Sequence, residues 1–219
     1  MELLAWLQDC EDSDCVVKCG DAEFKVHQSI LREASPLLDV YLSCSSTKHK
    51  KVVSVPHNFG MYTMQALLEF MYDDNYSFEP DTKGQKDLVA ACKFHITVGI
   101  AARWYEMDGE DSLDDLSRRK LKSSLPGVEA DGLAQIVRSA NQLAVDFKTQ
   151  RMVARAVARA MQNENNKHYF KHLDMSEDFR GLVNFFFQDW LKQAAANPGS
   201  KGTLDKSTTL LPVVSGRMK

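Results

Sequence analysis

The stretch on which the fold prediction depends is residues 14–42, DCVVKCGDAEFKVHQSILREASPLLDVYL. Its first half holds two short strand-like runs on either side of Gly20-Asp21, where glycine supplies the positive φ of a tight turn. Phe24 and Val26 alternate with charged residues, which is the period of a half-buried strand. The sequence therefore predicts a β-hairpin over this part of the stretch.

Two helices are expected directly after the hairpin. Ile30 and Leu31 supply the apolar positions of the first helix. Ser35-Pro36 stops that helix and offers an N-cap and an N1 proline for the second. A third strand is expected at residues 52–55. Apolar residues at helical spacing predict further helices over 59–72, over 86–105 as one or two helices, and over 113–122.

The bulk composition indicates an ordinary globular protein. Of 219 residues, 44% are hydrophobic and 26% charged, and the net charge of -3 gives no overall attraction to nucleic acid or anionic lipid. Five cysteines without disulfide-rich spacing favour a reducing compartment. The N-terminal residues lack the basic region of a signal peptide, and no apolar run has the length of a membrane span. We expect an intracellular protein of the cytoplasm and/or nucleus, with no nucleic-acid, membrane or small-molecule ligand.

A domain boundary is expected at residues 123–127, which contain Pro126. Beyond it, three amphipathic helices have apolar residues at spacings of three and four, as in a helical bundle. The end of the chain loses this periodicity and contains Gly and Ser. The prediction is therefore a first domain at 1–123, an all-α helical extension at 127–196, and a mobile tail at 197–219.

The order of these motifs resembles the BTB/POZ domain family, especially its short fungal form. The matching segments are Asp14, Phe24-Lys25-Val26-His27, Ile30-Leu31, Ser35-Pro36-Leu37-Leu38, residues 67–72 (LLEFMY) with Asn75-Tyr76, and residues 101–121 (AARWYEMDGEDSLDDLSRRKL). Several motifs in the family's order are far more specific than any single one. The resemblance covers roughly residues 3–123 and leaves out the later helices.

The resemblance implies an α+β fold, in which a small sheet made of the hairpin and the third strand is wrapped by helices. It also implies a protein–protein interaction module without catalysis or cofactors, which forms homodimers and recruits protein partners. Some members of the family are adaptors that hold the cullin scaffold of a ubiquitin ligase complex. The alternative is a monomeric adaptor, or a transcription-associated scaffold that binds no cullin.

Asp14 and His27 are expected to have structural roles. Imidazole titrates near neutral pH, so His27 could be a general base or a metal ligand. Its place at a strand–helix junction favours a buried structural hydrogen bond, to Asp14 or to a backbone carbonyl. Cys10, Cys15 and Cys19 with His27 lack the second close-spaced ligand pair of a structural zinc site, so we expect no metal.

Cys44 carries the remote enzymatic alternative, a thiol hydrolase. A reactive cysteine needs an electropositive, accessible setting, and Cys44 is followed closely by Lys48, His49 and Lys50. No known catalytic signature surrounds it. We therefore expect no catalytic residue.

Apolar residues at both ends of the chain are candidate interface positions. Leu3, Leu4 and Leu7 lie on one face of a short predicted helix that needs a partner surface, and they are candidate dimer contacts. Near the other end, Phe185 is the first of three consecutive phenylalanines, which cannot all face inward, so we expect it to be exposed.

Six residues are candidate contacts for other partners: Tyr41, Leu42, Lys48, Lys50, Tyr105 and Phe185. By contrast, the basic run at 118–122 directly follows an acidic run, so that their fields largely cancel at a distance. We interpret this run as a solvated helix face.

Overall fold

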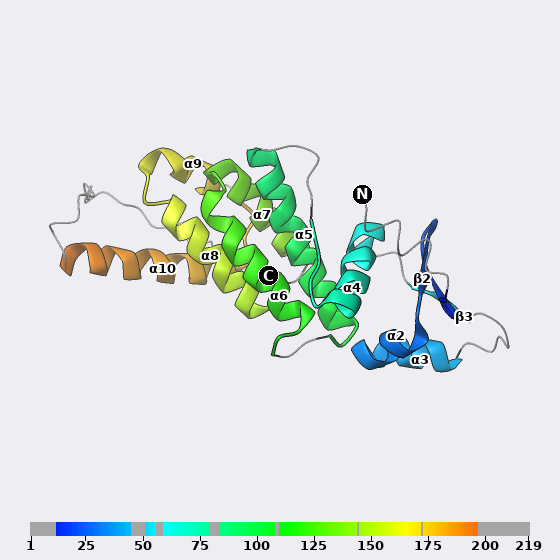
Figure 1. Cartoon of the computed structure of the whole chain (residues 1–219). Helices are drawn as coiled ribbons and strands as arrows, with labels where there is room; N and C mark the ends of the chain where they lie inside the picture. Colours follow the sequence, from blue (N-terminus) through cyan, green and yellow to red (C-terminus); the bar gives the residue numbers. More distant parts are fainter. Residues whose placement is uncertain are drawn as a thin grey trace, which may run out of the picture. The chain divides into compact units, whose positions relative to one another are not determined.

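The computed structural model describes residues 12–44, 51–55, 59–78, 84–107, 110–143, 145–171 and 173–196. The chain divides into two compact units (Figure 1). Unit 1 comprises residues 1–79 and 94–121, and unit 2 comprises residues 80–93 and 122–219. The predicted helix 2–8 and the predicted tail 197–219 lie outside the described residues.

Unit 1 contains a three-stranded sheet formed by β1 (Cys15–Cys19), β2 (Ala22–Val26) and β3 (Lys51–Ser54). The order is β2-β1-β3, with β1 antiparallel to β2 and parallel to β3. Gly20 has φ of 61°, which is the left-handed conformation that a tight turn needs and that glycine adopts without strain. The predicted hairpin and third strand are confirmed, with the third strand one residue earlier than expected.

Unit 1 also contains helices, two of which extend into unit 2. They are α2 (Gln28–Ala34), α3 (Pro36–Cys44), α4 (Met61–Asp73), α5 (Gln85–Trp104) and α6 (Leu113–Ser124). The first nine residues of α5 and the last three of α6 belong to unit 2. The α5 segment, expected as one or two helices, is a single helix of 20 residues. Ser35 separates α2 from α3, and its Oγ accepts a hydrogen bond from the Leu38 amide at 3.2 Å, as predicted for an N-cap.

The core of unit 1 lies between the sheet and its helices. Strand residues Val17, Phe24 and Val26 are at most 1% exposed, and Leu38 and Leu67 from the helices are completely buried beside them. Side chains of this kind stabilise the folded state by roughly 1.5–3 kcal/mol each. The alternation read from the hairpin therefore places its apolar face on the core.

Unit 2 is helical in its described part. Its main helices are α7 (Ala130–Gln142), α8 (Phe147–Ala160) and α10 (Glu177–Ala196), and these are the three predicted helices. A short helix, α9 (Lys167–Lys171), was not predicted. Asp146 caps α8, because its side chain accepts hydrogen bonds from the amides of Lys148 and Thr149. Both α7 and α10 pack on α8.

The fold class is confirmed: a small mixed sheet with helices, followed by a helical extension. In the described ranges, no helix has the length and apolar character to cross a membrane.

Candidate functional site

The strand–helix junction at His27 is held by Tyr72 of α4. The Tyr72 hydroxyl accepts a hydrogen bond from the His27 amide at 2.8 Å and lies 2.9 Å from His27 Nδ1. The two residues are 45 positions apart in the chain. The sequence predicts Asp14 or a backbone carbonyl as the partner of His27, and the structure gives it the phenol of Tyr72. This contact ties the end of β2 to α4.

The side chain of Asp14 forms hydrogen bonds with Gln28, the residue that follows His27 in the chain. The Gln28 amide donates to Asp14 Oδ1 at 2.8 Å, and the Gln28 side-chain amide donates to Asp14 Oδ2 and to the Asp14 carbonyl, both at 3.2 Å. The first amides of a helix have no intrahelical acceptor. The Asp14 carboxylate provides an acceptor for one of them, the amide of Gln28 at the start of α2. Both predicted structural residues accordingly fix the junction between the sheet and α2.

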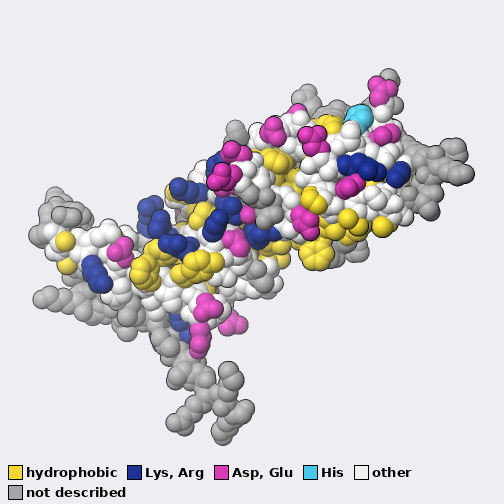
Figure 2. Space-filling model, turned by 90° about the horizontal axis from the view of Figure 1, so that it is seen from below, with side chains coloured by type: hydrophobic (Ala, Val, Ile, Leu, Met, Phe, Trp, Pro, Cys, Tyr) yellow, Lys and Arg dark blue, Asp and Glu magenta, His cyan; other side chains and the backbone are white. Residues whose placement is uncertain are grey.

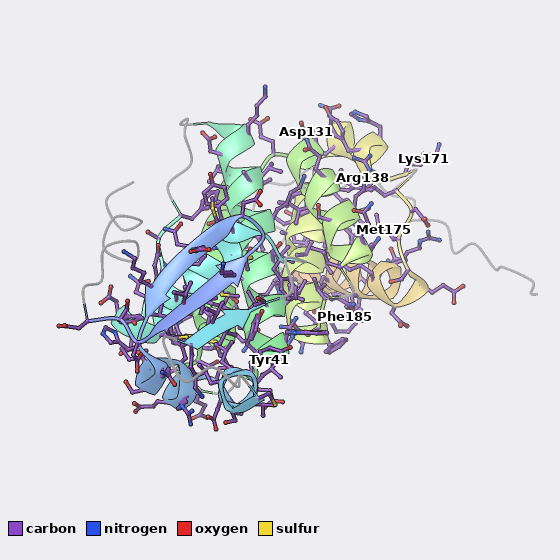
Figure 3. The ribbon with its side chains drawn as sticks, turned by 90° about the vertical axis from the view of Figure 1, so that its right-hand side faces the viewer. Tyr41, Asp131, Arg138, Lys171, Met175 and Phe185 are labelled. Carbon is purple, nitrogen blue, oxygen red and sulfur yellow. The ribbon has the colours of Figure 1, made fainter. Side chains whose placement is uncertain are left out.

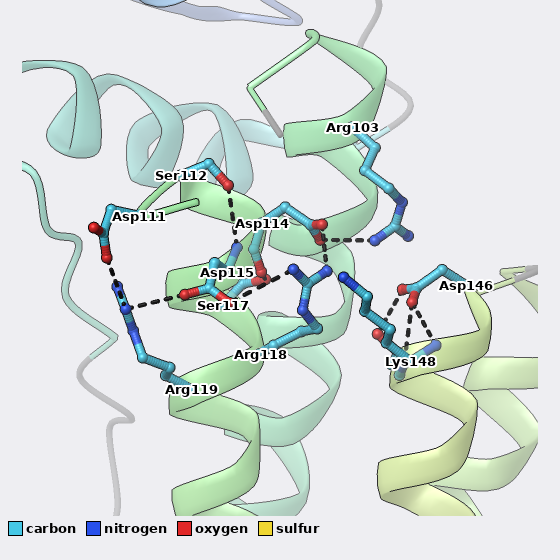
Figure 4. Close-up of polar contacts among 11 residues, drawn as sticks. Arg103, Asp111, Ser112, Asp114, Asp115, Ser117, Arg118, Arg119, Asp146 and Lys148 are labelled. Carbon is cyan, nitrogen blue, oxygen red and sulfur yellow. Dashed lines mark hydrogen bonds and ion pairs between the residues drawn. The ribbon is translucent and has the colours of Figure 1, made fainter. Parts of the chain in front are cut away.

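A network of ion pairs joins α5 to α6 in unit 1 (Figure 4). The Asp114 carboxylate accepts from Arg103 at 2.7 Å and from Arg118, and its side chain is only 6% exposed. Arg118 is itself 14% exposed. Arg119 pairs more loosely, with Asp111 at 3.2 Å and an exposed fraction of 54%. The interpretation of the basic run as a solvated face is therefore wrong for Arg118, whose charge is half of a buried pair.

A second polar cluster is buried beside this network. The hydroxyl of Tyr76 lies 2.8 Å from Nδ1 of His95, and these residues are 2% and 7% exposed. Burial, with the nearby Lys120 charge acting in the same direction, lowers the pKa of His95 to about 4. Burial raises the pKa of Tyr76. The His95 ring is thus neutral at pH 7.

A cavity of about 420 Å³ lies among α2, α4 and the segment after α5. Glu33, Asp74, Glu106 and Asp111 are among the residues that line it. Three of these, Asp74, Glu106 and Asp111, have φ between 52° and 57°, an uncommon conformation for residues other than glycine. In the described residues the lining holds no lysine or arginine. The cavity is an acidic concavity on unit 1.

Two aromatic rings in the described part of unit 1 are exposed, and a third, the half-buried Phe59, contacts one of them. Tyr62 at the start of α4 is 65% exposed and Trp104 at the end of α5 is 53% exposed. Phe59, three residues before Tyr62, contacts Trp104 edge to face, with 6.3 Å between ring centroids. We call Phe59, Tyr62 and Trp104 the aromatic trio. Large exposed aromatic side chains mark interaction sites, because Trp and Tyr dominate the energetics of protein interfaces.

Two of the candidate partner residues belong to the core. Leu42 and Tyr105 are completely buried, so their prediction as partner contacts is wrong. Tyr105 lies beside a buried turn, because its carbonyl accepts a hydrogen bond from Ser35 Oγ at 2.6 Å. Tyr41 is half-buried and packs against the same core.

The remaining candidates are exposed or fall outside the described residues. Phe185 on α10 is 63% exposed, as expected from its place in the phenylalanine run (Figure 3). Lys48 and Lys50 lie in a segment that the structure does not describe, and so do Leu3, Leu4 and Leu7. These five positions stay predictions.

The cysteines give little support to redox or metal chemistry. Cys15, Cys19 and Cys92 are buried free thiols, and burial raises the pKa of Cys92 to about 12. Cys44, the residue of the thiol hydrolase alternative, is an exposed free thiol at the end of α3. Across the ranges that the structure describes, no three Cys, His, Asp or Glu side chains are grouped to hold a metal.

The fold and its surfaces thus define a small α+β domain with buried polar pairs and exposed aromatic rings, as in a protein-binding module. The comparison with protein families agrees, because residues 5–102 match the family model of the BTB/POZ domain. The chain carries a BTB/POZ domain, and such a domain is a protein–protein interaction module. The search of curated proteins found no match.

Sequence reasoning missed the aromatic trio. Trp104 lies in the matching segment 101–121, and its spacing from the other apolar residues of the helix predicted over 86–105 predicts a core contact. That prediction is wrong, because Trp104 is 53% exposed. The signal that could have found it is the end of the helix: Trp104 is the last residue of α5. Side chains at a helix end have fewer neighbours, so an aromatic residue there is less often covered.

Proposed function

We propose that this chain is a non-enzymatic intracellular module that self-associates and recruits protein partners through unit 1. The observation that supports the proposal is the exposure of Tyr62 and Trp104 in a unit whose other large aromatic side chains are mostly covered. An aromatic side chain buries roughly 150–250 Å² when it is fully covered, so two of them are large contributors to a standard interface.

Self-association uses the aromatic trio together with the leucines near the start of the chain. Leu3, Leu4 and Leu7 form an apolar face in the sequence, and Tyr62 and Trp104 add exposed aromatic area. Charged residues are depleted at the centres of interfaces, so a carboxylate at these leucines opposes association.

Light scattering on the full chain tests this function. The wild type is expected to have about twice the mass of one chain, and Tyr62→Ser/Trp104→Ser the mass of one chain. The Leu3→Asp/Leu7→Asp variant tests the leucine contacts separately. The matched control is Phe147→Ser/Phe185→Ser, which removes two exposed rings from unit 2 and is expected to leave the mass unchanged. Identical masses for wild type and both unit 1 variants would contradict the proposal.

A role as a cullin adaptor is the finer form of the same proposal, and it is supported by the BTB/POZ domain alone. Affinity purification of the tagged chain followed by mass spectrometry tests it. A cullin that copurifies with wild type supports the adaptor role. A stable dimer without a cullin favours a scaffold, and a wild-type monomer at high concentration favours the monomeric adaptor.

Intracellular location is the part of the proposal that the cysteines support. The described cysteines are free thiols, which fits a reducing compartment. Labelling with a thiol-reactive probe at neutral pH tests the thiol hydrolase alternative. Selective, rapid labelling of Cys44 over a free cysteine standard would favour the enzyme, because reactivity follows the thiolate fraction.

A further inference from the structure

The α8 helix in unit 2 carries an arginine at every fourth position, and the function proposed for unit 1 gives these arginines no role. Residues 151–161 read RMVARAVARAM, with arginine at every fourth position: Arg151, Arg155 and Arg159. All three arginines are exposed, whereas Val153 and Val157 are completely buried. The buried face holds α8 in unit 2, and the arginine row lies on the exposed side of the helix.

The spacing of the arginines is regular, so it can equal the spacing of side chains along one face of a second helix. At 3.6 residues per turn, the three arginines and the exposed Lys148 fall within an arc of about 80° on α8. They extend over about 16 Å along the helix axis, which is three helical turns. Met152, Ala156 and Ala160 are half-buried and form a second, apolar line directly beside the first.

The two lines border a groove of about 640 Å³ in unit 2. Its other wall includes the apolar residues Leu125, Val128 and Leu133. Lys122 adds a further basic side chain, and Glu129 is the one acidic residue among the described residues of the lining. The groove therefore combines an aliphatic floor with five basic groups and a single carboxylate.

The positive charges of the row are not neutralised within the described part of the chain. Arg151, Arg155 and Arg159 make no ion pair there. Arg155 lies instead over the ring of Phe186, at 4.9 Å from its centroid, and Arg151 lies 5.7 Å from the ring centroid of Phe147. A ring restrains a guanidinium without cancelling its charge, so its donors stay open to an acceptor.

We propose that this groove binds an acidic amphipathic helix of a partner protein. Carboxylates on one face of such a helix, repeated every three or four residues, would meet the arginine row at the same spacing. Apolar side chains beside them would cover the line of Met152, Ala156 and Ala160. Figure 2 shows dark blue Lys and Arg side chains gathered beside yellow hydrophobic ones on the side of the picture that α8 and α10 occupy in Figure 1.

The lining favours a protein helix over nucleic acid. Single-stranded nucleic acid binds on aromatic platforms, whereas the groove has an aliphatic floor. Phosphate contacts alone would leave the half-buried Met152 and Ala156 uncovered. This groove lies in unit 2, so its test does not depend on self-association through the aromatic trio.

The test mixes the full chain with a labelled synthetic helical peptide that has four copies of Glu-Leu-Ala-Ala. Binding of the peptide is measured by its fluorescence anisotropy. Wild type is expected to bind the peptide and not its Lys-for-Glu counterpart. Arg151→Glu/Arg155→Glu/Arg159→Glu is expected to raise the Kd tenfold or more, about the sum of three lost and reversed charge contacts. The matched control is Arg138→Glu/Lys171→Glu/Lys192→Glu, which makes the same charge change at exposed positions of unit 2 outside the groove lining (Figure 3).

A second variant tests the apolar line. Met152→Gln keeps the net charge and is expected to weaken peptide binding severalfold. A single-stranded oligonucleotide, tested in parallel, is expected not to bind wild type. No peptide binding by wild type would overturn the proposal, and so would equal Kd values for the arginine variant and its control. Tight oligonucleotide binding, with no peptide binding, would assign the row to nucleic acid instead.

Discussion

The charged residues of the two units have opposite surroundings. In unit 1, Asp114 is held between Arg103 and Arg118 and is 6% exposed, so its charge is neutralised inside the fold. In unit 2, Arg155 and Arg159 follow an exposed line of α8 without a carboxylate partner in the described residues. Removing one member of a buried charge pair destabilises a fold, whereas exposed charges without partners are free to bind another molecule.

The same contrast separates the polar groups from the aromatic groups of unit 1. His95 and Tyr76 are polar side chains buried against each other, while Tyr62 and Trp104 are large rings left in solvent. We infer that the buried polar pairs maintain the domain and the exposed rings serve its contacts.

The largest expected effect is at Asp114. Replacement by Asn removes the charge between Arg103 and Arg118 and leaves two partly buried guanidinium groups without it. Chemical denaturation of the full chain should show a loss of about 3–4 kcal/mol in the free energy of unfolding. Asp111→Asn is the control, because Asp111 is 91% exposed and also pairs with an arginine of α6, yet should cost less than about 1 kcal/mol. Equal losses would contradict the assignment of a buried structural pair.

The second effect is a pH dependence at His95. Its pKa in the folded chain is about 4, below the ordinary value of 6.5, so the unfolded chain takes up the proton first as the pH falls. The stability that the neutral ring contributes is therefore fully present above pH 6.5 and is lost between pH 6.5 and 4. The loss is roughly 3 kcal/mol.

His95→Gln isolates this contribution, because Gln keeps an acceptor for the Tyr76 hydroxyl and does not titrate. Between pH 7 and pH 4, the unfolding free energy of wild type should fall by roughly 3 kcal/mol more than that of His95→Gln. A difference that stays constant over this range would show that His95 is not held neutral by burial.

The smallest predicted effect concerns close packing in unit 2. A Cβ at Gly132 in α7 would lie 2.6 Å from Val89 Cγ2 and 2.8 Å from Val128 Cγ1. Gly132→Ala should therefore cost roughly 1–3 kcal/mol by thermal or chemical denaturation. Gly181→Ala in α10 meets nothing within 4 Å and should instead stabilise the chain by about 0.5–1 kcal/mol. Similar effects of the two changes would argue against tight packing at Gly132.

Local features of the sequence predicted the hairpin and the start of α3 well. The turn at Gly20 and the cap at Ser35 depend on one or two residues whose preferences are strong. The family resemblance was confirmed over residues 5–102 because it combined several such features in order. Features that depend on neighbouring residues were therefore within reach of the sequence.

Contacts between distant residues were not within reach. The partner of His27 is 45 residues away at Tyr72, and spacing alone cannot identify it. The burial of Leu42 and Tyr105 likewise depends on what packs over them. The arginine row was visible as a repeat of four, but its lack of partners could be seen only once the surrounding carboxylates had positions.

The measurement that tests the central claim most directly is quantitative affinity purification of three tagged full-length chains. They are wild type, Tyr62→Ser/Trp104→Ser and Arg151→Glu/Arg155→Glu/Arg159→Glu. The two surfaces are predicted to bind different partners, so each variant should lose a different subset of the copurifying proteins. Tyr62→Ser/Trp104→Ser should also fail to copurify an untagged second copy of the chain. Recovery of the same proteins in the same amounts with all three chains would contradict the claim that the two surfaces bind different partners.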